Sequence, residues 1–441
     1  MKVPGQWWLA SVLLVVLGSG HALGASSNAM TIPLEYQETS YQFLFRNIPI
    51  EHRSVPFPKE PAPASGPVVR GLLHFGDNPG NAIPFLWQPR ATNLSLGLNG
   101  TQDLGGDPAR VSAGKALWSA EPSFIIQMFT NIHLSFPASS AGAPMLMDLH
   151  FCLDTARRPG QPLCNAALRS CWQGKVTLDG HDWQVGLVQN ISDAPGSFRH
   201  GQLLLRPWEE SNRPFYAFSE GSDTYAIPWE GQNCVVRASD AFAFSPKVFF
   251  DGHACQLDWS AEPQGCGDKL ALQLTEEQTA LGELRITGTS IERLVLTGEP
   301  YVIVLAQPPA SVKVPPGRYH PYRVWLKEGK TRAYFNFGLP QNGKVNLFEE
   351  ITGAKLPVLS LPPPEQAIVV DVLRPALLAV GGPLTNGVSA TRHGRDLMLS
   401  YRLIGAGGGE YRVWQGTNRM SPQFTVCKSG KTIGTGNFEF G

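Results

Sequence analysis

The feature that most constrains this chain is its succession of short apolar runs, each ended by glycine, proline or another turn residue. Val68–Phe75, Met145–Leu153 and Tyr322–Lys327 are typical of these runs, and the chain holds 46 Gly and 37 Pro to separate them. The runs do not continue into the 3.6-residue period of a long amphipathic helix. Strands at this short spacing predict an all-β fold of several antiparallel β-sandwich domains in tandem.

The N-terminus has the three-part layout of a cleavable secretory signal. Lys2 precedes the apolar stretch Trp7–Leu17, and small residues follow at Ala22–Ala25. The alternative, a single membrane anchor, is disfavoured because the apolar stretch is shorter than the roughly 20 residues that a bilayer core requires. We therefore expect residues 1–24 to be a signal peptide and the mature chain to be exported to the periplasm, cell surface or extracellular space, without a membrane span.

Charge restricts the class of partner. Lys plus Arg and Asp plus Glu both number 36, and neither sign forms a long run. This balance argues against nucleic acid or an anionic membrane surface as the main partner. A carbohydrate or an envelope protein remains as a candidate partner, and no cofactor is predicted apart from the calcium considered below.

A chain of 441 residues exceeds what one core supports, so several domains are expected. Residues 25–66 are interpreted as an N-terminal extension that ends in a Pro-rich linker, and residues 67–281 as a β-rich domain, either single or in two halves. The predicted boundaries of these halves and of the C-terminal domains are 67–180, 181–281, 282–361 and 366–441. The last boundary follows from three successive prolines in Leu361–Glu365, which cannot donate ladder hydrogen bonds.

Two resemblances bear on these domains. The turn Val314–Tyr319, with sequence Val-Pro-Pro-Gly-Arg-Tyr, precedes an alternating strand, and the segment 284–348 around it resembles the transthyretin-like or prealbumin-like sandwiches of exported bacterial proteins. That resemblance implies a structural or binding module without catalytic residues. Through Cys171–Gly180 and Gly430–Gly441 the whole chain resembles uncharacterised exported bacterial multi-domain β-sandwich proteins. The six strands expected in 366–441 have the size of one immunoglobulin-like sandwich.

The chain has seven cysteines and no Cys-x-x-Cys spacing. If Met145–Leu153 and Leu163–Trp172 form a hairpin, Cys152 and Cys164 fall opposite each other, and a disulfide between them is predicted. The alternative is that they are buried thiols that act as packing residues.

A loop rich in oxygen side chains is the candidate metal site. It offers Asn99, Thr101, Asp103 and Asp107, and it resembles the Asp-x-Asn-x-Asp-Gly type of calcium loop. Gly97 occupies the place of the first carboxylate, so the loop is degenerate. The alternative is an ordinary polar turn.

An aromatic stretch is the candidate ligand-binding surface. Trp208, Tyr216, Tyr225 and Trp229 lie in a segment with few strand signals. Exposed aromatic rings on a β protein can stack on sugar rings, which makes carbohydrate a candidate ligand. The alternative is that these rings pack over a core edge.

Catalytic motifs are absent from the sequence, which contains no Gly-x-Ser-x-Gly and no His-Glu-x-x-His. His181 beside Asp182, and His253 near Asp258, are separated by an odd number of positions, so their side chains point to opposite faces of a strand. The sequence therefore favours a non-catalytic binding or structural protein. The alternative is a carbohydrate-active or other hydrolytic enzyme whose site is assembled from distant loops.

Overall fold

The computed structural model describes most of the chain after the predicted signal. The described residues are 29–39, 41–43, 45–62, 66–76, 78–98, 104, 109–112, 124–134, 145–154, 161–191, 198, 201–210, 236–237, 241–261, 269–336, 367–415 and 418–438.

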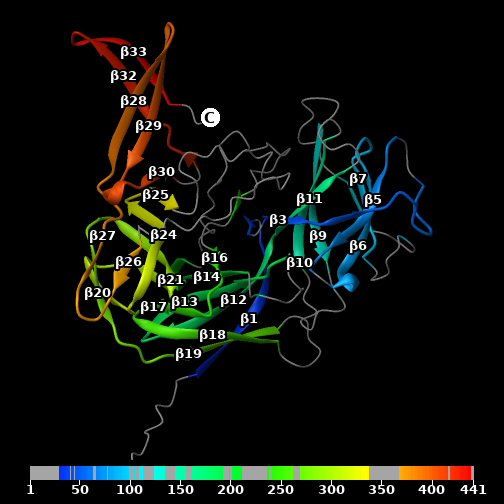
Figure 1. The fold of residues 1–441 in the computed structure, drawn as a ribbon, viewed down its shortest axis with the longest axis horizontal. Coiled ribbons are helices and arrows are strands. Elements are labelled where there is room, and N and C mark those ends of the chain that lie inside the picture. The colour runs from blue at the N-terminus through cyan, green and yellow to red at the C-terminus, as the bar shows by residue number, and fades with distance from the viewer. Residues whose placement is uncertain are drawn as a thin grey trace, which may run out of the picture.

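The prediction of an all-β fold with several antiparallel sheets is confirmed (Figure 1). Among the described residues the only helical elements are short 3-10 turns, namely η1 (Pro79–Asn81), η2 (Trp208–Glu210) and η5 (Ala406–Gly408). Two lobes and a projecting pair of hairpins make up the molecule.

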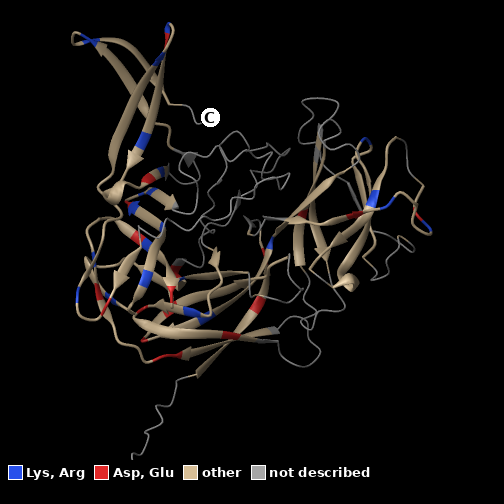
Figure 2. Ribbon diagram, viewed as in Figure 1, with Lys and Arg blue, Asp and Glu red and all other residues tan. Residues whose placement is uncertain are grey.

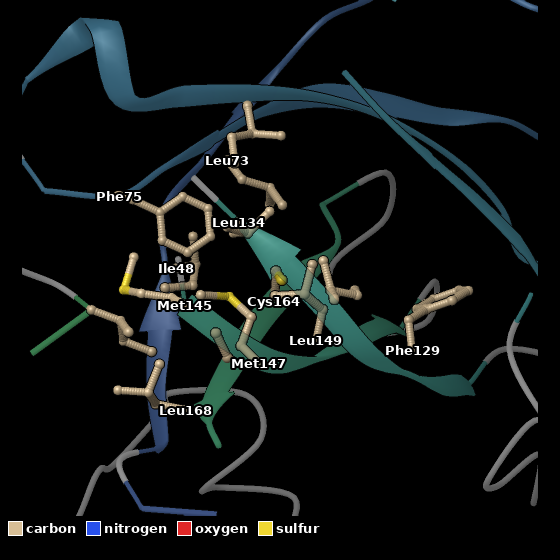
Figure 3. Close-up of a cluster of buried hydrophobic side chains, with 14 of the residues drawn as sticks. Ile48, Leu73, Phe75, Phe129, Leu134, Met145, Met147, Leu149, Cys164 and Leu168 are labelled. Atoms are coloured by element: carbon tan, nitrogen blue, oxygen red, sulfur yellow. The ribbon is translucent and has the colours of Figure 1, made fainter. Parts of the chain in front are cut away.

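The first lobe is a two-layer sandwich, drawn in blue to teal in Figure 1. One layer contains β4 (Ile50–His52), β5 (Val69–His74), β6 (Ala82–Gln88), β7 (Asn93–Leu96) and β8 (Ala109–Ser112). The other contains β3 (Phe45–Ile48), β11 (Leu163–Leu168), β10 (Met145–Asp154) and β9 (Phe124–Leu134). Figure 3 shows Leu73 and Phe75 of the first layer facing Met145, Met147 and Leu149 of the second. We call this lobe the first sandwich.

The second lobe is built on one long sheet of 17 strands. These strands are β1 (Ala29–Glu38), β12 (Ser170–Leu178), β13 (His181–Val188), β14 (Gln202–Pro207), β16 (Ala241–Ala243), β17 (Lys247–Phe250), β18 (His253–Ala261), β19 (Lys269–Glu276), β21 (Ile291–Glu299), β22 (Val302–Ala306), β24 (Gly317–Glu328), β25 (Thr331–Asn336), β26 (Ile368–Val370), β28 (Thr385–His393), β29 (Asp396–Ile404), β30 (Glu410–Gln415) and β31 (Asn418–Arg419).

The pairings of this sheet define a continuous path. From β16 it runs through β14, β13 and β12 to β1, and then through β19, β18, β17, β22 and β21 to β24. Beyond β24 come β25, β30, β29 and β28. A separate sheet of β23 (Ser311–Val314), β20 (Gly282–Ile286) and β27 (Ala376–Leu378) lies beside it, and β15 (Val236–Arg237) pairs with β2 (Tyr41–Gln42).

Alternation along the middle strands of the long sheet fills two cores, one on each face. On β17, Val248 and Phe250 belong to the core that the curled sheet encloses, together with residues of β12, β13 and β14. Phe249, between them, faces the other core, which the sheet of β20, β23 and β27 covers. The middle strands are therefore apolar on both faces.

The two C-terminal hairpins project from the second lobe (Figure 1). They are β28–β29, with its turn at Gly394–Arg395, and β32–β33, formed by β32 (Gln423–Lys428) and β33 (Lys431–Asn437). We call these two hairpins the arm. Most side chains of the arm are exposed. Residues 366–441 are predicted as an immunoglobulin-like sandwich. The described residues of this segment that are buried belong to the core shared with β20 to β25 and not to a core of the segment's own; they are Val370, Ala376, Leu378, Val380 and Tyr411.

The predicted extension and linker, 25–66, is also folded into the sheets. Met30, Ile32, Leu34 and Tyr36 alternate along β1, and Ile32 and Leu34 are buried in the core enclosed by the long sheet. Prolines obscure this alternation in the sequence because Pro33 stands in the middle of the strand. Burial of Ile32 and Leu34 on one face stabilises this strand, and Pro33 is tolerated where β1 pairs with β19 alone, because the pairing with β12 covers only residues 35–38.

The Pro-rich stretch is held against the first sandwich. Phe57 is buried and its backbone N–H donates to Glu60 Oε2 at 3.0 Å. Arg70 of β5 donates to both carboxylate oxygens of Glu60, at 3.0 and 2.7 Å. This segment is therefore part of the lobe rather than a spacer before it.

We predict that Phe151→Ala destabilises the first sandwich by about 3–5 kcal/mol, because the ring is fully buried and its removal leaves a cavity. Its ring centroid lies 5.2 Å from Phe85, 5.1 Å from Trp87 and 5.9 Å from Phe129. Hydrogen exchange should show faster exchange of the β6 and β10 amides. Val388→Ala, on the exposed arm, is the control and should leave those amides unchanged; equal protection in both variants would contradict the prediction.

Candidate functional site

The structure describes only part of the residues that the sequence singled out. Asn99, Thr101, Asp103 and Asp107 lie outside the described residues, so the calcium loop stays a prediction. Across the part of the chain that is described, no three His, Cys, Asp or Glu side chains are placed to hold a metal ion.

Of the aromatic candidates, Tyr216, Tyr225 and Trp229 also lie outside the described residues. Trp208 follows β14 in η2 and is 37% exposed. The ammonium group of Lys175 lies 5.1 Å from the centroid of its ring, within the range of a cation–π contact. A half-exposed ring beside a cation is compatible with ligand stacking and with packing, so this prediction also stays open.

The prediction of a disulfide between Cys152 and Cys164 is wrong, because both are free thiols and the register of β10 and β11 does not place them opposite each other. Cys152 pairs with Leu163, and Cys164 pairs with Phe151, so the two cysteines are offset by one position. Successive side chains of a strand point to opposite faces, and a bridge between them cannot form. Cys164 is a buried thiol of the first sandwich, and burial raises its pKa well above the ordinary value.

Two hairpin turns of the second lobe share the tripeptide Asp-Gly-His. Asp179-Gly180-His181 joins β12 to β13, and Asp251-Gly252-His253 joins β17 to β18. The φ angles are 44° and 83° for Asp179 and Gly180, and 51° and 86° for Asp251 and Gly252. Two consecutive positive φ values define the type I′ hairpin turn, for which Asp-Gly is a preferred pair.

These two turns meet and exchange contacts reciprocally. His181 Nδ1 lies 3.0 Å from Asp251 Oδ2, and His253 Nε2 lies 3.2 Å from Asp179 Oδ2. His253 Nδ1 lies a further 2.8 Å from Glu276 Oε1 of β19. We call these five side chains the turn cluster. It lies at one end of the core that the long sheet encloses, where the Trp183 ring packs edge-on against Phe250 at 5.2 Å.

Sequence reasoning compared each histidine with its neighbours and missed these partners. Asp182 instead contacts Lys175 at 2.5 Å and Thr177 at 2.6 Å, which hold its pKa below the ordinary value through hydrogen bonds. A signal was present: 176–185 and 248–257 carry Val, Asp, Gly, His and Gln at matching positions. Two hairpins with the same turn, placed in one lobe, could have indicated a reciprocal contact.

A second polar group lies on the other face of β17 and β19. Lys247 Nζ contacts the Glu277 carboxylate at 2.8 and 2.9 Å, and the Tyr301 hydroxyl donates to it at 2.6 Å. Hydrogen bonds from Lys247 and then Tyr301 lower the pKa of Glu277. Burial and then the Glu277 hydrogen bond raise the pKa of Tyr301, and burial raises the pKa of Cys255 to about 12.

These shifts keep Glu277 charged and keep Tyr301 and Cys255 neutral at neutral pH. An efficient general acid or base needs a pKa near the working pH. The three groups are therefore suited to holding β17, β19 and β22 together rather than to proton transfer.

A shallow pocket of about 440 Å³ lies where β21 begins and β24 ends. Thr289, Ser290, Gln307 and Lys327 contribute to its lining, together with Glu292. The buried Glu292 carboxylate is ion-paired with Lys327 at 3.5 Å and with Arg332 at 3.2 Å. Its charge is thus balanced within the chain, which leaves the pocket little net charge to recognise a ligand.

Among the described residues, five exposed large apolar side chains lie on the arm or on the segment that joins its hairpins: Val388, Leu397, Met398, Met420 and Ile433. A second group, Val369, Val372, Leu373 and Leu377, lies on and between β26 and β27. Apolar groups gathered on projecting elements are typical of interaction surfaces.

Comparison of the chain with models of known families, with curated proteins and with solved structures yields no match. Within the described residues, no helix is long and apolar enough to cross a membrane.

We predict that the two histidines of the turn cluster differ in their contribution to stability. The His253 side chain is 14% exposed and contacts two carboxylates, whereas His181 is 72% exposed and contacts one. His253→Ala should cost about 1–2 kcal/mol, and His181→Ala, which removes an exposed pair, less than about 1 kcal/mol. Urea unfolding of the two variants measures the difference, and equal costs would contradict the assigned contacts.

A second prediction concerns pH. Because the folded pKa of Glu277 lies below its ordinary value of 4.5, its carboxylate stabilises the fold above that pH. The contribution is lost as the pH falls through the folded pKa. Glu277→Gln should therefore be less stable than the natural chain at neutral pH, and the gap should close in acid. Urea unfolding across the pH range measures this gap. A gap that is constant with pH would show that Glu277 contributes through shape alone.

Proposed function

We propose that the protein is an exported, non-catalytic binding or structural protein of the cell envelope or extracellular space, and that the arm is its recognition surface. The observation that carries this proposal is the exposure of the arm: Leu397 is 58% exposed and Ile433 is 63% exposed on hairpins that project from the body. A folded chain gains stability by burying such side chains. Their retention at the surface is accounted for by a partner that covers them.

The base of the arm is anchored in the core of the second lobe. Tyr411 of β30 is buried in the core under β20 and β27, and its hydroxyl accepts a hydrogen bond from the Gly381 backbone N–H at 2.9 Å. Its ring lies 5.3 Å from that of Phe335 on β25. β30 pairs with both β25 and β29, so the first hairpin continues directly from the long sheet. This continuity supports presentation of the arm by a rigid body.

Export follows from the signal-like residues 1–24 and belongs to the same proposal. The transthyretin-like likeness of 284–348 supports a structural or binding module. Carbohydrate and envelope proteins are the candidate ligands, with Trp208 as an additional aromatic contact.

The turn cluster is the observation that bears on the hydrolytic alternative, because a histidine beside carboxylates is the arrangement of a general base. In His253 both ring nitrogens contact carboxylates, Nδ1 with Glu276 and Nε2 with Asp179. A general base needs one nitrogen directed at the substrate. This arrangement favours a structural role for His253, whereas His181, whose Nδ1 alone contacts a carboxylate, is the residue of the turn cluster that the hydrolytic alternative would use.

We predict that the mature chain is retained on one ligand class without releasing product from it. The test presents residues 25–441 to arrayed glycans, cell-wall fragments and envelope lipids, with and without calcium, and measures retention and released product together. Substitution of Val388, Leu397 and Met398 by Ser should weaken retention at least about ten-fold, because the triple change removes exposed apolar side chains from both faces of the first hairpin and a ligand on either face loses contact area.

The matched control replaces Val369, Val372 and Leu373, which are also exposed but lie on the body, by Ser and should retain the ligand fully. Released product would contradict the proposal and turn attention to the turn cluster. Equal loss in both triple variants would show that the arm is not the recognition surface.

A further inference from the structure

The tips of the arm combine positive charge with exposed apolar side chains. Figure 2 shows Lys and Arg at the ends of both hairpins. The first tip carries Arg392 and Arg395 beside Leu397, and the second carries Lys428 and Lys431. Ile433 follows the second tip and is exposed.

The second tip holds like charges together. Lys428 and Lys431 are directly opposite in the ladder, joined by Ser429 and Gly430 with positive φ values of 50° and 78°. Like charges directly opposite each other destabilise a strand pair. The segments Gln423–Lys428 and Lys431–Asn437 contain no Asp or Glu that could offset them. The fold thus tolerates a repulsion that an anionic partner would relieve.

The apolar face of the first hairpin leads toward its tip. Leu397 and Tyr401 lie on one face of β29, since they are an even number of positions apart, and Arg392 and Val388 are their ladder partners. Near the base this face is covered, because the Tyr401 ring lies 5.2 Å from Phe438, which lies 5.0 Å from Phe424. Val388, opposite Tyr401, and Leu397, nearer the tip, remain exposed on this face.

We infer that the tips of the arm bind the surface of an anionic lipid bilayer, with the cations at the headgroups and Leu397 and Ile433 at the acyl boundary. This inference rests on the proposed function of the arm as a recognition surface. A cationic surface with apolar side chains matches both parts of such a partner. A hydrophilic polyanion would use the cations and leave the apolar groups in water, and an added strand would pair with backbone along an edge without needing charged tips.

The net charge of zero of the whole chain is compatible with this inference, because attraction to a charged surface acts within a Debye length of the charges. Only the hairpin tips need to approach the surface. The two hairpins carry five Lys or Arg, at 392, 395, 402, 428 and 431, against a single carboxylate at Asp396.

The test is flotation of the mature chain with vesicles of equimolar phosphatidylcholine and phosphatidylglycerol, compared with vesicles of phosphatidylcholine alone. We expect binding to the anionic vesicles that weakens as salt is added. Each cation near an anionic surface changes affinity about five-fold, so Lys428→Gln with Lys431→Gln should bind about 30-fold more weakly. Leu397→Ser with Ile433→Ser should weaken binding at least about ten-fold.

Two control variants carry matched changes on the body: Lys313→Gln with Arg374→Gln, and Val372→Ser with Leu373→Ser. Both should bind the anionic vesicles like the natural chain. Equal binding to both vesicle types, or equal loss in the control variants, would overturn the inference.

Other outcomes separate this inference from the proposed function. Binding of soluble heparin without binding of anionic vesicles would overturn the lipid surface as partner. A dimer in sedimentation velocity that the Leu397 and Ile433 variant abolishes, without vesicle binding, would do the same in favour of a second copy. In either case the arm would remain a recognition surface. If the arm variants kept both vesicle binding and ligand retention, the proposed function of the arm would be contradicted as well.

Discussion

The architecture depends on the double pairing of β1. Residues 29–35 of this strand pair with β19, and residues 35–38 pair with β12, so one strand joins the two halves of the long sheet. Ile32 and Leu34 then fill the core between those halves. The approach of β12 is close enough to require glycine, since a Cβ on Gly174 would lie 2.4 Å from the Pro33 carbonyl oxygen. Without β1, β12 and β19 would both be open edges and the core beneath them would face water.

Sequence periodicity predicts strands well here because it reports the local alternation of burial, and the all-β fold follows from it. Periodicity does not show whether another part of the chain covers the apolar face of a strand. Val388 and Leu397 lie on one face of a hairpin, and Ile32 and Leu34 lie on one face of β1, yet the first pair is exposed and the second is buried. The sequence pattern alone predicts a sandwich for 366–441 and an extension for 25–66. Both differences arise from pairings between distant strands, which a single sequence does not encode locally.

The turn cluster shows the same limit for sites. Local reasoning established that His181 and Asp182 point to opposite faces, and their separate partners agree with this. The partner of His181 is Asp251, 70 residues away. Only the recurrence of Asp-Gly-His in a comparable strand context pointed across that distance. The calcium loop and most of the aromatic stretch lie outside the described residues and stay predictions.

The distribution of charge separates the body of the protein from its arm. In the body, carboxylates are balanced within the chain: the buried Glu292 contacts Lys327 and Arg332, and the partly exposed Glu277 contacts Lys247. Paired charges of this kind stabilise or position strands and attract little from outside. At Lys428 and Lys431 the fold instead places two cations side by side on a hairpin without a carboxylate. A neutral chain can therefore present a cationic surface, because its opposite charges lie on different parts of the structure.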